Sequence, residues 1–259
     1  MKKIFLCALF VLLVSSISVS AQNSAIDPAA LLKNMPNLST QVFKGMFADL
    51  AKQPPKSATK TQNNNDGTNN QTATPKNQSS TIISPADDKN TAGKTTFTPT
   101  SSFLMLKEFS KQLGKNEEER KKYEKLLTEG YTGYELGLKN RGLTRNDVAR
   151  SASSLLNGCL KIYKDSELSD AQLAGIYRQT KEIFEANEDF LTSTNTERQK
   201  AYEVNIMLWA LIHAYYFNAK QMNDPKIIKA VGDVTAVIFE VVTGESIKNV
   251  KVTDDGLKM

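Results

Sequence analysis

The residues of this sequence with the most reactive side chains are one histidine and one cysteine. His213 is the only histidine, so a histidine-based metal cluster and a catalytic pair of histidines are excluded. Cys159 lies on the apolar stripe of a predicted helix, where a buried thiol behaves as a small apolar group. If two helices bring His213 and Cys159 together, they form a buried polar pair, the one weak candidate for a site. The favoured interpretation places both in the core, and we assign no catalytic residue and no metal site.

Other patterns associated with catalysis or cofactor binding do not occur in the sequence. There is no phosphate-binding glycine loop, no dinucleotide fingerprint and no G-x-S-x-G elbow. The paired acids Glu188–Asp189 and Asp254–Asp255 lie in or beside predicted loops, where caps and turns explain them better than a glycosidase pair does. The sequence therefore predicts no cofactor.

Several aromatic side chains could line a cavity for an apolar ligand, and they fit core packing equally well. They are Tyr131, Tyr134, Tyr202, Trp209, Tyr215, Tyr216 and Phe217.

An uncharged stretch, Met207–Phe217, lies at the centre of the predicted fold. It belongs to a helix over about residues 195–219, which Thr194 and Glu197 open as a capping box. The stretch is apolar on nearly every side, and such a helix must be enclosed by others. We therefore expect a wholly buried central helix.

The apolar spacing predicts further helices around this one. They cover Ser101–Leu113, Asn116–Leu138, Thr144–Tyr163, Ser169–Ala186 and the segment from Pro225 to Gly244. Thr144 and Ser169 are the expected caps of the third and fourth. The second could break near Gly130, although glycine on a packing face also lets another helix come close.

The C-terminal region leaves a choice between helix and strand. Val234–Val242 is rich in β-branched residues, but a strand needs a partner and no second convincing strand is present, so helix is preferred. Ile247–Val252 could form a short extended piece. Asp254–Gly256 is typical of a turn that lets Leu257 fold back.

The N-terminus predicts export. Lys2 and Lys3 precede an apolar run, and small residues end at Ala21, as in a cleavable secretory signal covering residues 1–21. The run is shorter than a bilayer span needs, so no transmembrane span is expected after cleavage. Loss of the two lysines lowers the formal net charge from +5 to +3, too little to indicate a nucleic-acid partner. The single remaining cysteine cannot form an internal disulfide.

Three segments follow the signal. Residues 22–52 contain an amphipathic helical pattern capped by Ser39, whose stripe comprises Val42, Phe43, Met46, Phe47 and Leu50. This stripe docks on the chain's own domain, the preferred interpretation, or on a partner or membrane surface. Residues 53–96, rich in Asn, Gln, Thr and Ser, are expected to be a disordered linker. Residues 97–259 form the predicted helical domain.

The domain resembles a family of secreted bacterial proteins known only as a domain of unknown function. The resemblance rests on LTRNDVARSASSLL (Leu143–Leu156) and on the closing VTDDGLKM (Val252–Met259), and it covers about residues 97–259. It implies an all-helical fold and export, and it supplies no catalytic residues. The expected fold is all-α, an irregular bundle of about five or six helices packed around the apolar helix at 195–219.

These observations favour a non-enzymatic exported protein, periplasmic or secreted, that binds or scaffolds a protein partner in the cell envelope. The alternative is a helical carrier of a small apolar ligand. An enzyme of unknown type ranks third, because a fold does not fix a function.

Overall fold

The longest helix of this computed structural model is α9, Asn195–Gln221, and three other helices pack against it. The structure describes residues 93–258. These contain α4 (Leu106–Leu113), α5 (Glu117–Arg141), α6 (Val148–Lys164), α7 (Asp170–Ala186), α8 (Glu188–Thr192), α9, α10 (Pro225–Thr243), the 3-10 helix η2 (Ile247–Asn249), and strands β1 (Lys251–Thr253) and β2 (Gly256–Lys258). The all-α fold is thus confirmed.

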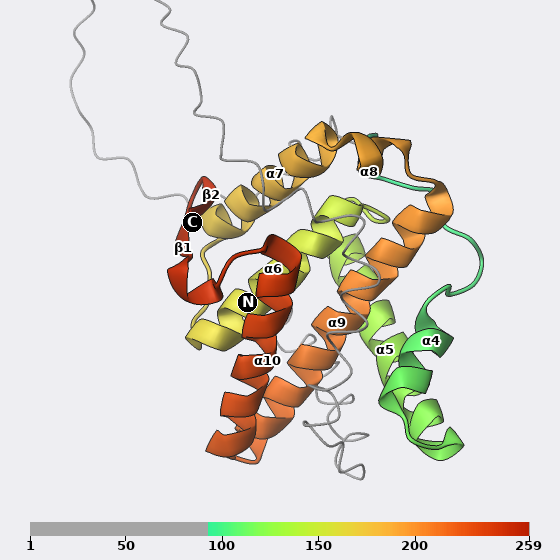
Figure 1. The fold of residues 1–259 in the computed structure, drawn as a ribbon, viewed down its shortest axis with the longest axis vertical. Helices are drawn as coiled ribbons and strands as arrows, with labels where there is room; N and C mark the ends of the chain where they lie inside the picture. Colours follow the sequence, from blue (N-terminus) through green and yellow to red (C-terminus); the bar gives the residue numbers. More distant parts are fainter. Residues whose placement is uncertain (1–92, 259) are drawn as a thin grey trace, which may run out of the picture.

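Helices α5, α6 and α10 surround α9, while α7 packs on the far side of α6 and α4 pairs with α5 (Figure 1). The interior is one apolar cluster to which every α-helix contributes. Within it the α9 residues Val204, Met207 and Leu211 have no exposed surface. The prediction of a central apolar helix is correct.

The expected capping signals set most helix boundaries. Ser169 with Gln172 and Thr194 with Glu197 form complete capping boxes at the starts of α7 and α9. Asp224 caps α10, whose first residue is Pro225. Helix α10 runs through Val234–Val242, so the choice of helix over strand is confirmed.

The start of α6 was wrongly placed. Asp147, and not Thr144, is the cap, because its carboxylate accepts hydrogen bonds from the amides of Ala149 and Arg150. Asn146 has a φ of 54°, a left-handed conformation that keeps the preceding residues out of the helix.

Helix α5 is unbroken at Gly130, where it passes closest to α9. A Cβ atom at this position would overlap the Cβ of Ala210. Gly130 therefore allows α5 and α9 to approach closely, as the sequence suggested. The break in α5 that was considered near Gly130 does not occur. The helix ends after Arg141 with Gly142 in the left-handed conformation, φ 67°.

The first helix was predicted too long. It begins at Leu106, whereas 101–105 are irregular, because the amides of Leu104 and Met105 bind the side chain of Glu203. Helix α8 was not expected, since its five residues fall in a predicted loop.

The chain ends in a small antiparallel hairpin that packs on α7. Strand β1 pairs with β2 in the register Lys251 to Lys258, with Leu257 buried. The folding back of Leu257 is confirmed, but the expectation that the domain has no pair of strands is wrong. The predicted signal, amphipathic segment and nearly all of the linker lie outside the described residues.

Candidate functional site

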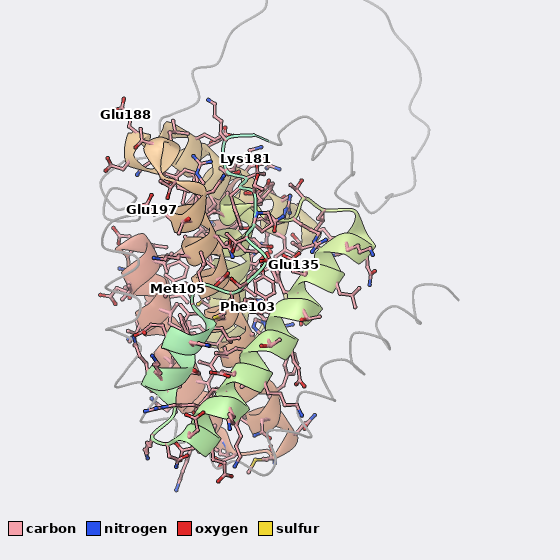
Figure 2. All side chains as sticks on the ribbon, turned by 90° about the vertical axis from the view of Figure 1, so that its right-hand side faces the viewer. Phe103, Met105, Glu135, Lys181, Glu188 and Glu197 are labelled. Carbon is pink, nitrogen blue, oxygen red and sulfur yellow. The ribbon has the colours of Figure 1, made fainter. Side chains whose placement is uncertain are left out.

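An irregular segment before α4, residues 94–105, is held along α9 by side chains of that helix. We call this segment the strap. Asn195, Gln199 and Glu203 are spaced four residues apart, so they lie above one another on the same face of α9. Figure 2 shows the strap running down this face of the domain, past Glu135 and Phe103 to Met105.

Gln199 binds both a donor and an acceptor of the strap. Its Oε1 accepts from the amide of Thr100 at 2.7 Å, and its Nε2 donates to the carbonyl of Ser102 at 3.0 Å. The same Nε2 donates to Glu203 Oε1 at 2.8 Å. These partners fix the orientation of the Gln199 amide group. In the flipped orientation its NH₂ group would face the amide of Thr100, and its oxygen would face the oxygens of Ser102 and Glu203.

Glu203 holds the end of the strap. Its Oε2 accepts from the amides of Leu104 at 2.9 Å and Met105 at 2.8 Å. The residue is 1% exposed, and this burial raises the pKa of its carboxyl above the ordinary value, against the lowering effect of the hydrogen bonds. The carboxylate therefore replaces the helical acceptors that these two amides would otherwise need.

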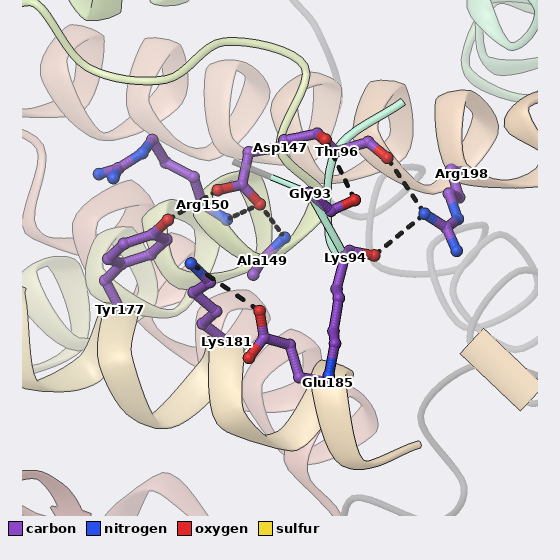
Figure 3. A network of polar contacts seen from close by, with 10 residues as sticks. All are labelled: Gly93, Lys94, Thr96, Asp147, Ala149, Arg150, Tyr177, Lys181, Glu185 and Arg198. Carbon is purple, nitrogen blue, oxygen red and sulfur yellow. Dashed lines mark hydrogen bonds and ion pairs between the residues drawn. The ribbon is translucent and has the colours of Figure 1, made fainter. Parts of the chain in front are cut away.

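Arg198 holds the beginning of the strap. Its guanidinium donates to the carbonyls of Lys94 at 3.0 Å and Thr96 at 3.1 Å (Figure 3). It also donates to the carbonyls of Phe190 and Leu191 in α8, and it lies 4.8 Å from the centroid of the Phe190 ring. One side chain thus joins the strap, α8 and α9.

Backbone hydrogen bonds fix the same end of the strap to the start of α6. The amide of Val148 donates to the carbonyl of Thr95 at 3.0 Å, and the amide of Phe97 donates to Asn146 at 3.1 Å. The Phe97 ring packs edge-on against Tyr202 of α9, with 5.3 Å between centroids. The point where the chain enters the domain is therefore fixed by α6, α8 and α9 together.

A buried carboxylate lies beneath the middle of the strap and forms an ion pair with an exposed arginine. Glu135 of α5 is 7% exposed and accepts hydrogen bonds from the Tyr202 hydroxyl and from Arg145. Burial, followed by nearby tyrosines and the Glu135 charge, raises the pKa of Tyr202 far above its usual range. A tyrosine held neutral and enclosed in this way is suited to donating a hydrogen bond to Glu135, not to nucleophilic attack.

A second polar cluster lies where α6 meets α7. Asp147 caps α6 and also accepts from the Tyr177 hydroxyl at 2.7 Å (Figure 3). The Arg150 guanidinium lies 3.8 Å from the centroid of the Tyr177 ring. These groups join α6 to α7.

The two residues predicted as a weak polar pair belong to facing helices. Cys159 of α6 has no exposed surface, and burial raises the pKa of its thiol well above its usual range. His213 of α9 lies against Gly158, and its Nδ1 is 2.8 Å from the carbonyl oxygen of Trp209. No hydrogen bond joins the Cys159 and His213 side chains in the described part of the chain. Burial of the Cys159 thiol, through its raised pKa, favours the neutral form of the group.

His213 is part of a row of rings on one side of α9. The ring centroids of Trp209 and His213 are 4.5 Å apart, and those of His213 and Phe217 are 6.1 Å apart. All three side chains are half-buried, and we call them the aromatic stripe. The expectation that the central helix is wholly buried is therefore wrong on this side. Burial lowers the pKa of His213 to about 4.

The other aromatic residues considered for a cavity make defined contacts with one another or with polar groups. Tyr134 packs against Trp209 at 5.5 Å, and its hydroxyl lies 3.1 Å from Ser154 Oγ. The hydroxyls of Tyr123 and Tyr215 are 3.4 Å apart.

The paired acids fall at a helix start and a turn. Glu188 and Asp189 lie in the first turn of α8, and Asp254–Asp255 form the turn between β1 and β2. Within residues 93–258, no three His, Cys, Asp or Glu side chains are grouped so that they could hold a metal ion. In the same range no helix is long and apolar enough to cross a bilayer.

Sequence reasoning missed the strap and the three polar side chains of α9 that bind it. Asn195, Gln199 and Glu203 could have been noticed as three polar residues at helical spacing ahead of the uncharged stretch. Their partners could not, because they lie 97 to 99 residues away in the chain.

Comparisons with known proteins give one match. The model of a family described as a family of unknown function, DUF6683, matches residues 2–259. The match extends beyond the resemblance over 97–259 and takes in the amphipathic segment and the linker. No curated protein matches the chain, and no solved structure matches it. Because the match covers nearly the whole chain, the protein belongs to this family of unknown function.

Proposed function

We propose that the protein is a non-enzymatic exported module of the cell envelope that binds or scaffolds a partner protein through its helical domain. The supporting observation is that the chain enters the domain at a fixed point. Arg198 and Glu203 hold the two ends of the strap, so residues before 93 connect to the longest helix at a defined point. A binding domain that follows the predicted linker needs such a fixed attachment of the linker to the domain.

The polar groups that could do chemistry support the non-enzymatic part of the proposal. Glu135, Asp147 and Glu203 each accept two or more hydrogen bonds from the protein itself. Each of these groups stabilises a junction between elements, which is a structural role.

The proposal is tested by site-specific photo-cross-linking in cells that produce the full chain. A photoreactive residue replaces one of the exposed apolar side chains, Leu136 on α5 or Val237 on α10, which are 37% and 42% exposed. We expect a discrete adduct with one protein at one of these positions. Lys121, exposed on the first half of α5, is the matched control position. The same adducts at all three positions, or none at any, would contradict a specific partner surface.

The enzyme alternative is tested in the same cells by replacing His213 and Cys159 separately. A variant that keeps its fold and its cross-linked adduct but loses the cellular phenotype of the protein would favour catalysis. Variants that keep all three would support the binding module.

A further inference from the structure

The aromatic stripe of α9 lies between two close helix contacts and is covered completely by neither. Helix α5 meets α9 at Gly130 and Ala210, whereas α6 meets it at Gly158, where an added Cβ would lie 2.6 Å from His213. Trp209, His213 and Phe217 keep part of their surface exposed. The exposed parts of these rings offer apolar surface to a further chain segment.

One feature of α6, whose Gly158 lies against His213, fits the approach of a further chain segment. On the α6 side, the Oδ1 atom of Asn157 is buried, and no hydrogen bond reaches it from the residues that the structure describes. A buried acceptor of this kind costs free energy unless a donor is supplied.

The chain itself carries a segment of matching chemistry. From Ser39 to Leu50 the sequence predicts an amphipathic helix with Val42, Phe43, Met46, Phe47 and Leu50 on one face. Such a face is unstable in water unless it covers an apolar surface. The family match includes this segment together with the domain.

The connection between the segment and the stripe has a suitable length. Residues 53–92 belong to the predicted linker, called the tether below, and a flexible chain of this length would have an end-to-end distance of about 35 Å. The tether enters the domain beside Arg198, and the path along α9 from there to Phe217 is about 29 Å at the helical rise. A tether whose reach matches the span gives an effective concentration on the order of 1 mM.

We propose that Ser39–Leu50 docks in cis on the aromatic stripe of α9, between α5 and α6, so that the N-terminal segment folds back onto the domain of the same molecule. This inference does not rest on the proposed binding function, because it concerns contacts within one chain. Docking closes a loop through the tether and covers Trp209 and Phe217.

The only tryptophan of the chain, Trp209, reports directly on this contact. The experiment compares a form beginning at Gln22, after the predicted signal, with a double variant, Phe43→Asp and Phe47→Asp. We expect the tryptophan emission of the variant to shift to longer wavelength and its protection against acrylamide quenching to be lost. Lys44→Gln, on the polar side of the same segment, is the matched control and should leave both unchanged. Far-ultraviolet circular dichroism checks that the domain stays folded.

Addition of the free peptide 37–52 to the double variant, at about 1 mM, should restore the emission of the parent chain. Unchanged emission and quenching in the double variant would overturn the proposal. A difference that disappears on dilution would overturn docking in cis in favour of a second copy. Binding to anionic lipid vesicles that requires Phe43 and Phe47, with no dependence of Trp209 on them in solution, would overturn it in favour of a membrane.

Discussion

Replacement of Glu203 by glutamine should loosen the strap, and the hydrogen-bond pattern gives the expected size of the effect. The carboxylate accepts three hydrogen bonds, from Leu104, Met105 and Gln199, and each of these three partners is a donor. A glutamine amide must put its NH₂ group toward one of these donors. The amide of Gln199 cannot turn to compensate, because its Oε1 already accepts from Thr100.

At least one buried donor is therefore left without an acceptor in Glu203→Gln. The cost of such a donor is about 1–3 kcal/mol, and the removal of a buried charge offsets part of it. Glu203→Ala removes all three acceptors and should cost more. Glu182→Gln makes the same chemical change on the exposed side of α7 and should leave the free energy of unfolding unchanged.

Two measurements check this expectation. Urea unfolding followed by circular dichroism gives the change in the free energy of unfolding, and amide hydrogen exchange reports on Leu104 and Met105 locally. Exchange at these two amides should accelerate more than exchange in α9, because the strap can open before the domain unfolds. Unchanged exchange at both amides, with a stability equal to that of the parent chain, would refute the reasoning.

The pH dependence provides a separate check on Glu203. Its pKa is raised in the folded state, so the folded protein binds the proton more tightly than the unfolded chain does. This contribution to stability is fully present below the unfolded pKa and is lost as the pH rises through the folded pKa. The destabilisation by Glu203→Gln should therefore be larger at pH 4 than at pH 7.

Three further predictions follow from packing and burial. Gly130→Ala should destabilise the protein by about 1–3 kcal/mol, because the added Cβ would overlap Ala210. Gly133→Ala should stabilise it by about 0.5–1 kcal/mol, because the space around that position is open. The midpoints of urea unfolding of the two variants check both expectations. Cys159 should not react with a thiol reagent at pH 8 until the protein unfolds, since burial raises its pKa, and stoichiometric labelling of the native protein would contradict this. His213, with its pKa lowered to about 4, should contribute stability above pH 6.5 that is lost as the pH falls toward 4, at most about 3 kcal/mol. The His213→Phe variant should lose less stability over that interval, and equal losses would exclude His213 as the cause.

Local signals in the sequence were sufficient to predict most helix boundaries. The capping boxes at Ser169 and Thr194 act within four residues, and each forms as predicted. Gly244 ends α10 in the left-handed conformation, φ 76°. Such features depend on neighbours in the chain, and they hold where no distant segment competes; at Thr144 the predicted cap does not form, and the strap pairs with residues 146–148 instead.

The errors came from contacts that are distant in sequence. Residues 101–105 carry a helical apolar pattern, but Gln199 and Glu203 bind their backbone more favourably in an irregular form. The central helix was judged from its own composition, which does not reveal that α5 and α6 leave Trp209 and Phe217 half-buried. The interpretation of His213 as a residue among apolar neighbours agrees with its lowered pKa, although its position against Gly158 could not be foreseen.

The strap also constrains the order in which the protein can fold. Its amides emerge from the ribosome nearly 100 residues before the α9 side chains that bind them. Closing a loop of that length is slow compared with the formation of individual helices. The strap must therefore wait until the domain's longest helix has been made, and its attachment should be a late event in folding. Docking of residues 94–105 then marks the completion of the domain.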